Sequence, residues 1–333
     1  MKKIVPAFVV STMLLTAPAA FAVSNDSIDL GHADKAQATA AADVKSTQIN
    51  TKSEAMSLGN GYIATQIGKA KSAPNAPNWL KNADVSVQFG DGFKPQYSAE
   101  TLFPIGTETD RTTTFTQFRI GNDLGVGVTT NLGFGKRFLN QDKTAMTGVN
   151  LFYDHAWKYG HDRVGAGAEY FQGTAEYRAN VYHAISGEKE VDTVNHIFEK
   201  ALSGYDVEVG TSLPNAPWAK VFIQGYIWDY TYSEDAKGYK LRTELQVTPE
   251  VNVEYGYNHD NKGTDGNYGK IMYTFGQKGK SAMFEKGKPV FRSTDKVTVE
   301  SKRYDKVKRE NEIKVETYQK DNAGNVIVQF NKI

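Results

Sequence analysis

Twelve short segments between Asp84 and Phe275 alternate apolar and polar residues, and this pattern constrains the fold more than any other feature. A strand in which every second residue is apolar has one face suited to lipid or a core and another suited to water. Twelve such segments predict an all-β membrane protein, a 12-stranded antiparallel transmembrane β-barrel. We expect the strands near residues 84–90, 96–103, 113–121, 125–137, 144–154, 163–171, 174–183, 203–213, 218–230, 238–247, 250–258 and 267–275.

The first 22 residues have the pattern of a secretory signal peptide. Lys2 and Lys3 precede an apolar run from residue 4 to residue 15, and Ala20 and Ala22 form a small-x-small cleavage site. The alternative is a short transmembrane anchor, but this run is too short to cross a bilayer core of about 30 Å as a helix. We expect cleavage after Ala22.

The overall composition fits an exported barrel and argues against several other classes. The formal net charge is +1, so there is no basic footprint for nucleic acid. The chain has 18 Tyr, 17 Phe and 4 Trp, which suit interfacial girdles, and 0 Cys, which excludes disulfides and thiolate chemistry. The mean hydropathy of −0.50 agrees with a membrane barrel, because only alternate strand residues face lipid.

The chain divides into four parts. Residues 1–22 are the signal peptide, and 23–82 form a short N-terminal periplasmic segment that is either partly helical or disordered, ending in a linker. Residues 83–275 are the barrel, and 276–333 are a pore linker and short C-terminal tail. The tail has three short alternating patches and a turn at 321–325, so its end is either a hairpin or disordered.

The connections between the expected strands mostly alternate between tight and long, as in outer-membrane barrels with short periplasmic turns and long outer loops. With a periplasmic N-terminus, two connections fit poorly. The link from Pro104 to Thr112 is long for a periplasmic turn, and the link from Asn122 to Leu124 is short for an outer loop. The last strand carries Ile271, Tyr273 and Phe275, which resemble the C-terminal signal read by the barrel-assembly machinery; the alternative is a girdle aromatic.

Charged residues on the polar faces of the last strands are expected to face the lumen, where they would make it wet, grip a threaded tail or tune ion passage. These residues are Lys240, Arg242, Glu244, Glu254 and Lys270. Aromatic residues near the strand ends are interpreted as girdle anchors, with a sugar- or receptor-binding surface as the alternative. They are Tyr153, Trp157, Tyr159, Trp218, Trp228, Tyr230 and Tyr232.

Four outer-loop residues, Asp154, His155, His161 and Asp162, could suggest acid–base chemistry or a metal site. A hydrolytic site would need a nucleophile held by its base, and no Ser lies near this cluster in sequence. A metal on His155 and His161 would lack a closed ligand set. We therefore interpret the cluster as a hydrogen-bonded clamp between the fifth and sixth strands, and expect neither enzymatic activity nor a cofactor.

Several stretches resemble the translocator domain of the intimin/invasin family, the inverse autotransporters, from about Asn82 to Tyr318. A strand–loop–strand motif is carried by Tyr153, Asp154, His155, Arg163, Gly165, Gly167, Glu169 and Tyr170. The stretches 133–138 (GFGKRF) and 204–207 (GYDV) resemble two further family strands. A motif beyond the barrel is carried by Arg303, Tyr304, Val307, Arg309, Asn311 and Ile313.

This resemblance implies a 12-stranded barrel in the bacterial outer membrane and a C-terminal linker that threads the pore and presents immunoglobulin-like adhesive domains. The expected departure from this pattern is that little or no passenger follows the barrel. The expected role is anchoring and translocation of the C-terminal segment, with a contribution to adhesion or invasion. The alternatives are a channel, an export pore for a separate partner, or an adhesin that acts through its loops. The expected partners are outer-membrane lipids, the barrel-assembly machinery, periplasmic chaperones and a host receptor or exported protein. The side on which the tail ends stays open.

Overall fold

The computed structural model describes residues 80, 82–91, 93–276, 281–293 and 298–330. The predictions for the signal peptide, including Ala20 and Ala22, and for residues 23–79 lie outside these ranges. Among the described residues, no helix is both long enough and apolar enough to span a membrane.

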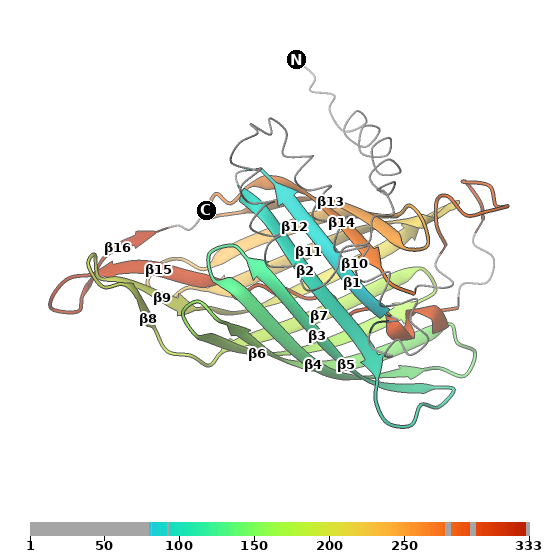
Figure 1. The fold of residues 1–333 in the computed structure, drawn as a ribbon, viewed down its shortest axis with the longest axis horizontal. Coiled ribbons are helices and arrows are strands. Elements are labelled where there is room, and N and C mark those ends of the chain that lie inside the picture. Colours follow the sequence, from blue (N-terminus) through green and yellow to red (C-terminus); the bar gives the residue numbers. More distant parts are fainter. Residues whose placement is uncertain (1–79, 81, 92, 277–280, 294–297, 331–333) are drawn as a thin grey trace, which may run out of the picture. The chain divides into compact units, whose positions relative to one another are not determined.

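Twelve antiparallel strands form a closed barrel, which confirms the predicted fold class (Figure 1). Each strand lies where alternation predicted it, with ends that differ by a few residues. In barrel order the strands are β1 (Ala83–Gly90), β2 (Phe93–Pro104), β3 (Thr112–Asp123), β4 (Gly127–Leu139), β5 (Ala145–Ala156), β6 (His161–Gln172), β7 (Ala175–Ala184), β10 (Ser203–Leu213), β11 (Ala216–Asp229), β12 (Ala236–Gln246), β13 (Val251–Asp260) and β14 (Gly266–Thr274).

The first and last strands close the barrel on each other. β1 pairs with β14 from Asp84 opposite Thr274 to Gly90 opposite Tyr268. Closure pairs the main-chain donors and acceptors of both strands, which would otherwise lie unpaired at an edge in hydrocarbon.

The two faces of the wall differ as the period of two requires. Leu151 and Ile223 project outward with 65% and 55% of their surface exposed. Arg137, Asp154 and Arg163 lie on the inner face and are 0–1% exposed. Charges that are buried to this extent must find partners inside the barrel.

The two ends of the barrel are distinguished by their connections. We call the end where β1 begins and β14 ends the near end; its connections are 105–111, 140–144, 173–174, 214–215 and 247–250. The opposite, far end has the turn between β1 and β2 and the connections 124–126, 157–160, 185–202, 230–235 and 261–265.

A second sheet lies at the far end. The connection 185–202 contains β8 (Lys189–Asp192) and β9 (Ile197–Ala201), which pair as a hairpin that strand alternation did not predict. The tail forms a 3-10 helix, η4 (Glu300–Tyr304), and then β15 (Val315–Lys320) and β16 (Val326–Phe330). The sheet order is β16-β15-β9-β8, and Figure 1 shows these strands extending beyond the barrel wall. The tail therefore ends in a hairpin, one of the two predicted alternatives.

Candidate functional site

The tail passes through the lumen from the near end to the far end. At the near end the amide of Val299 donates to the carbonyl of Lys143, 2.9 Å away. At the far end the amide of Leu202 donates to the carbonyl of Lys314, also 2.9 Å away. Residues 299–314 thus join the two ends inside the barrel.

The unusually long near-end connection holds the start of the threaded tail. The Arg303 guanidinium donates to Thr113 Oγ1 (2.7 Å) and to the carbonyl oxygens of Thr109 (2.6 Å), Asp110 (3.2 Å) and Thr112 (3.0 Å). Sequence reasoning found this connection too long for the expected pattern. Its extra length provides a binding site for one arginine, lined by carbonyl groups.

Arg137 on β4 binds the tail through main-chain carbonyl groups. Its Nη1 donates to the carbonyls of Lys302 (3.3 Å), Arg303 (2.9 Å) and Asp305 (2.6 Å). Its Nε and Nη2 donate to Glu169 on β6, with a shortest distance of 2.9 Å. A buried chain without strand partners must have its polar groups satisfied by side chains, and here one arginine serves three carbonyls.

Other wall side chains continue this recognition along the tail. Gln117 accepts from the amide of Val307 at 2.8 Å, and Arg163 donates to the carbonyls of Glu310 at 2.7 Å and Glu312 at 3.1 Å. Further bonds to the tail main chain come from Asn131, Asn180 and Tyr182. Wall side chains thus bind the main chain of the tail along the whole depth of the lumen.

Asp154 on β5 is the centre of the deepest charge cluster. It accepts two bonds of 2.7 Å from Arg309 of the tail and one of 2.9 Å from Arg163 of β6. The three side chains are at most 2% exposed. Such a fork-on-fork pair fixes direction as well as distance. Asn131 donates to the same carboxylate at 2.8 Å.

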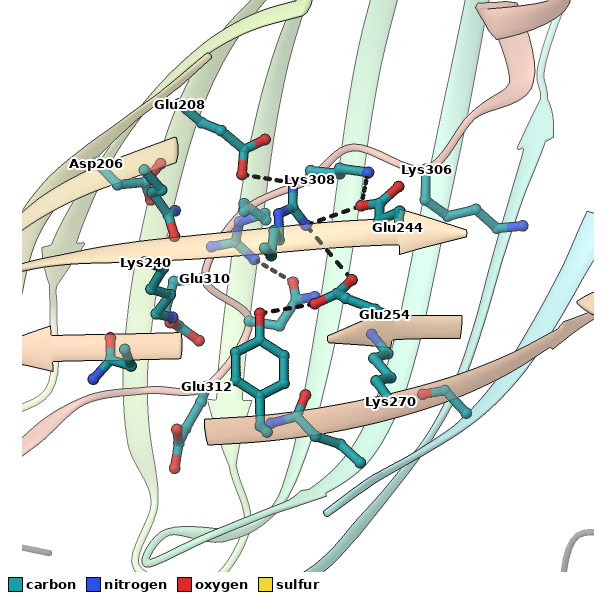
Figure 2. Close-up of a pocket in the computed structure, with 18 of the residues that line it drawn as sticks. Asp206, Glu208, Lys240, Glu244, Glu254, Lys270, Lys306, Lys308, Glu310 and Glu312 are labelled. Carbon is teal, nitrogen blue, oxygen red and sulfur yellow. Dashed lines mark hydrogen bonds and ion pairs between the residues drawn. The ribbon is translucent and has the colours of Figure 1, made fainter. Parts of the chain in front are cut away.

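Ion pairs hold the remaining tail charges against several strands. Lys302 pairs with Glu176 at 2.9 Å, and Lys306 pairs with Asp84 at 2.9 Å. Lys308 pairs with Glu244, and Glu310 pairs with Lys240 at 2.7 Å. Figure 2 shows Lys240 and Glu244 of the wall beside Lys308 and Glu310 of the tail.

All five residues expected in the lumen line one cavity there: Lys240, Arg242, Glu244, Glu254 and Lys270. Two of them contact the tail directly, Lys240 through Glu310 and Glu244 through Lys308. Arg242 instead pairs within the wall, with Glu208 at 2.6 Å. Glu254 accepts a bond of 2.8 Å from the hydroxyl of Tyr268.

The cavity lies beside the tail and has a volume of about 850 Å³. It is lined by the tail and by polar residues of β1, β2 and β12–β14, such as Gln88, Gln96 and Asn252. Its lining includes Thr274 at the near end and Asp91 at the far end, so it runs along the whole height of the wall.

His155 and Asp162 join β5 to β6 as the predicted clamp requires, whereas its other two members, Asp154 and His161, have different partners. Asp154 binds inside the lumen, whereas His155 contacts Asp162 at 2.8 Å, and Asp162 also accepts from the hydroxyl of Tyr153 at 2.5 Å. His161 contacts Glu199 of β9 at 3.3 Å. Within the described ranges, no group of three or more His, Asp or Glu side chains could hold a metal ion.

Other residues of the strand–loop–strand motif either leave space in the lumen or face outward. A side chain at Gly165 would lie 3.0 Å from Arg309, and one at Gly167 would lie 2.5 Å from Asn180. The glycines therefore leave room for groups that fill the lumen. Tyr170 points outward with 39% of its surface exposed.

The aromatic residues near the strand ends do not all act as girdle anchors. That interpretation is wrong for Trp228, which is 4% exposed, packs on Tyr182 at 5.2 Å between ring centroids and covers Arg163. Phe275, in the expected assembly signal, is fully buried beside the ring of Tyr273, and its amide donates to the carbonyl of Ala83. Ile271 on the same strand is half-buried.

The post-barrel motif falls on the tail where it contacts the wall. Val307 packs with Leu102, Phe115 and Phe152, while Ile313 packs in a second apolar cluster at the far end. The hydroxyl of Tyr304 donates to Glu108 at 2.9 Å, and the carbonyl of Asn311 accepts from Asn131. Together with Arg303 and Arg309, these residues all line the threaded path.

Sequence reasoning missed several residues that grip the tail, above all Arg137, Gln117 and Glu176. A signal was available, because each is a polar residue at an inward position of an alternating strand. What alternation could not show is that a tail 126 to 190 positions away would be their partner.

Comparison with known proteins places the chain among outer-membrane barrels. Residues 34–311 match the family model described as inverse autotransporter, beta-domain. A putative attaching and effacing protein homolog from Escherichia coli (strain K12) is 31% identical over 157 residues, covering 46% of this chain and 52% of that protein. Intimin from Escherichia coli O127:H6 is 26% identical over 193 residues, covering 56% of this chain and 20% of intimin. The alignments thus span about half the length of the first relative and a fifth of the second.

A solved structure described as "Unveiling the Mechanism Behind the in-meso Crystallization of Membrane Proteins" has the same fold. It superposes with a TM-score of 0.59 at 19% sequence identity, covering 71% of this chain and 99% of that chain.

Proposed function

This chain belongs to the inverse autotransporter family, and from that premise we propose that its barrel anchors and translocates its own C-terminal segment to the cell surface. The barrel belongs in the bacterial outer membrane, surrounded by lipid. We assign the near end to the periplasm and the far end to the outside, because outer-membrane barrels have longer connections outside.

One observation carries the proposal: the tail enters at Val299 and leaves at Lys314 at the opposite end, with wall contacts between them. A periplasmic tail would have no need of this path. The contacts include main-chain bonds from Arg137, Gln117 and Arg163, which an extended chain of another sequence could also accept.

The wall contacts suit two stages of the proposed translocation, the passage of the tail and its arrest in the final position. Main-chain contacts accept an extended segment with little regard for its side chains, which suits a chain in transit. Specific pairs, such as Asp154 with Arg309, are formed in one register alone. They would stop the tail in its final position and close most of the pore.

A role in adhesion is the second part of the proposal. Relatives carry the names intimin and inverse autotransporter adhesin, and the far end of this chain presents exposed side chains such as Trp157 and Ile185. We propose that the far-end loops and the exported hairpin contact a host surface receptor. Insertion would require the barrel-assembly machinery and periplasmic chaperones, and we propose no catalytic step.

A second candidate function is a narrow channel, favoured by the cavity of about 850 Å³ that runs beside the tail. Its lining mixes acidic and basic side chains, such as Glu100 and Lys270, so weak ion selectivity is expected. The same opening could serve a separate exported partner.

The test of translocation is an epitope tag fused after Ile333. Labelling of intact cells by an impermeant antibody supports export, whereas labelling only after permeabilisation contradicts it. Adhesion is scored separately, by attachment of cells that express the barrel to a host cell layer.

A further inference from the structure

We propose that the β8–β9 hairpin is a capture site for the first exported strand. It would receive residues 315–319 by strand addition as they leave the pore, and so favour the exported position of the tail. This inference rests on the proposed function, because it assigns a cause to the direction of transport.

The hairpin has turn and rim contacts that do not involve the tail. Its turn is closed by Asp192, whose Oδ1 accepts from the amides of Val194 (2.9 Å) and Asn195 (3.1 Å). Its second strand is fixed to the barrel rim by Glu199, which contacts His161 at 3.3 Å, and both side chains are buried. We infer that these contacts hold the edge of β9 in position to receive the tail.

The tail first makes a main-chain ladder at this hairpin. Inside the lumen its main chain bonds to side chains, but β15 pairs with β9 from Val315 opposite Ala201 to Gln319 opposite Ile197. The amide of Lys320 extends the ladder by donating to the carbonyl of His196 at 3.0 Å. Strand addition of this kind gains main-chain bonds with little dependence on sequence.

Side chains lock the captured strand. Tyr318 is fully buried and stacks on Phe198, with ring centroids 6.2 Å apart, and packs edge-on against Tyr232 at 4.6 Å. The Glu316 carboxylate accepts from the amides of Thr231 (2.8 Å) and Tyr232 (2.9 Å) on the next far-end loop. Two elements of the far end thus hold β15.

Capture stabilises both partners. An isolated two-stranded hairpin is marginal in water, whereas three or more strands with an apolar face are stable. Adding β15 and β16 converts the hairpin into a four-stranded sheet. The described near-end connections contain no strand to which β15 could add. We therefore expect the pairing at the far end to favour the exported position of the tail.

The first test compares Phe198→Ser with Val194→Ser, a control at the exposed tip of the same hairpin. Surface exposure of a tag after Ile333 is followed over time in cells pulsed with label, and barrel folding is checked by heat-modifiable migration. We expect Phe198→Ser to slow exposure roughly threefold to tenfold, the loss expected for an aromatic pair, with Val194→Ser unchanged. An unchanged rate in a folded Phe198→Ser barrel overturns the capture role.

The second test uses the absence of Cys from the sequence. The pair Ile197→Cys and Gln319→Cys lies in register and should form a disulfide during export, while Ile197→Cys with Ala323→Cys should not. If the wild-type tag reaches the surface but the variant with Ile197→Cys and Gln319→Cys forms no disulfide, the capture inference is wrong and translocation still stands. A wild-type tag that never reaches the surface overturns the proposed function itself.

Discussion

Asp154 and Arg309 are 155 positions apart in sequence, yet the carboxylate and the guanidinium meet in two hydrogen bonds of 2.7 Å inside the barrel. Arg163 donates to the same carboxylate from the neighbouring strand. One buried acid therefore joins two wall strands to the threaded tail. We propose that such contacts hold the exported tail in its final position.

Replacing Asp154 by alanine should release the tail from its final register. The change leaves Arg163 and Arg309 buried without their shared acid, at a cost of about 3–5 kcal/mol. The measurement is the denaturant midpoint for protease cleavage of the tail in the purified barrel.

Two controls separate this effect from a general loss of structure. Asp162→Ala removes a partly exposed acid, where a cost of about 0–1 kcal/mol is expected. The double variant Asp154→Ala with Arg309→Ala should recover part of the loss. Equal damage from Asp162→Ala and Asp154→Ala would contradict the assignment.

Leucine at Gly165 should displace Arg309, because even a Cβ at this position would lie 3.0 Å from the guanidinium. We expect a folded barrel with a tail that is more sensitive to protease. Ala168→Leu is the matched control, since it adds the same side chain to the exposed outer face of the same strand. If both variants behave like the wild type, the lumen has more room than the contacts indicate.

Docking of the exported hairpin should weaken in acid. Hydrogen bonds from Lys320 and Tyr318 hold the pKa of Glu188 below its ordinary value of 4.5. Since the pKa is lowered in the docked state, the stabilisation is present above pH 4.5 and is lost as the pH falls through the lowered pKa. Limited pepsin digestion of β15–β16 across the acidic range measures this loss. Glu188→Gln should flatten the pH dependence, and a wild-type curve without slope would refute it.

Removing residues 299–333 should widen the conducting path, because the tail occupies the lumen beside the existing cavity. We expect the truncated barrel to show a higher single-channel conductance in planar bilayers than the full chain. The full chain should conduct weakly through the cavity that remains. Equal conductance of the two proteins would mean that the tail does not fill the pore.

The sequence predicted the barrel well because its strands obey a local rule. Successive residues such as Leu241 and Arg242 face opposite sides of the strand, lipid on one side and water on the other. This alternation is visible within a single segment of sequence. The binding site of Arg303 and the pairing of β15 with β9 follow no local rule. They depend on contacts over more than 100 positions, and the hairpin in 185–202 is too short and polar to stand out.

The same limit explains the residues that were misplaced. Trp228 lies near a strand end, as girdle aromatics do, but it packs inside on Tyr182. His161 and Asp154 are close in sequence, but they serve the far-end hairpin and the lumen respectively. Spacing alone could not assign them to different partners.

The most direct test of the central claim labels the two ends of the tail in one experiment. Lys286→Cys and Asn325→Cys are single substitutions at exposed positions on either side of the threaded segment, in a chain with 0 native Cys. Intact cells are treated with a membrane-impermeant maleimide. We expect labelling of the Asn325→Cys protein on intact cells and of the Lys286→Cys protein only after permeabilisation. If both proteins are labelled only after permeabilisation, the tail does not cross the membrane and the account is wrong.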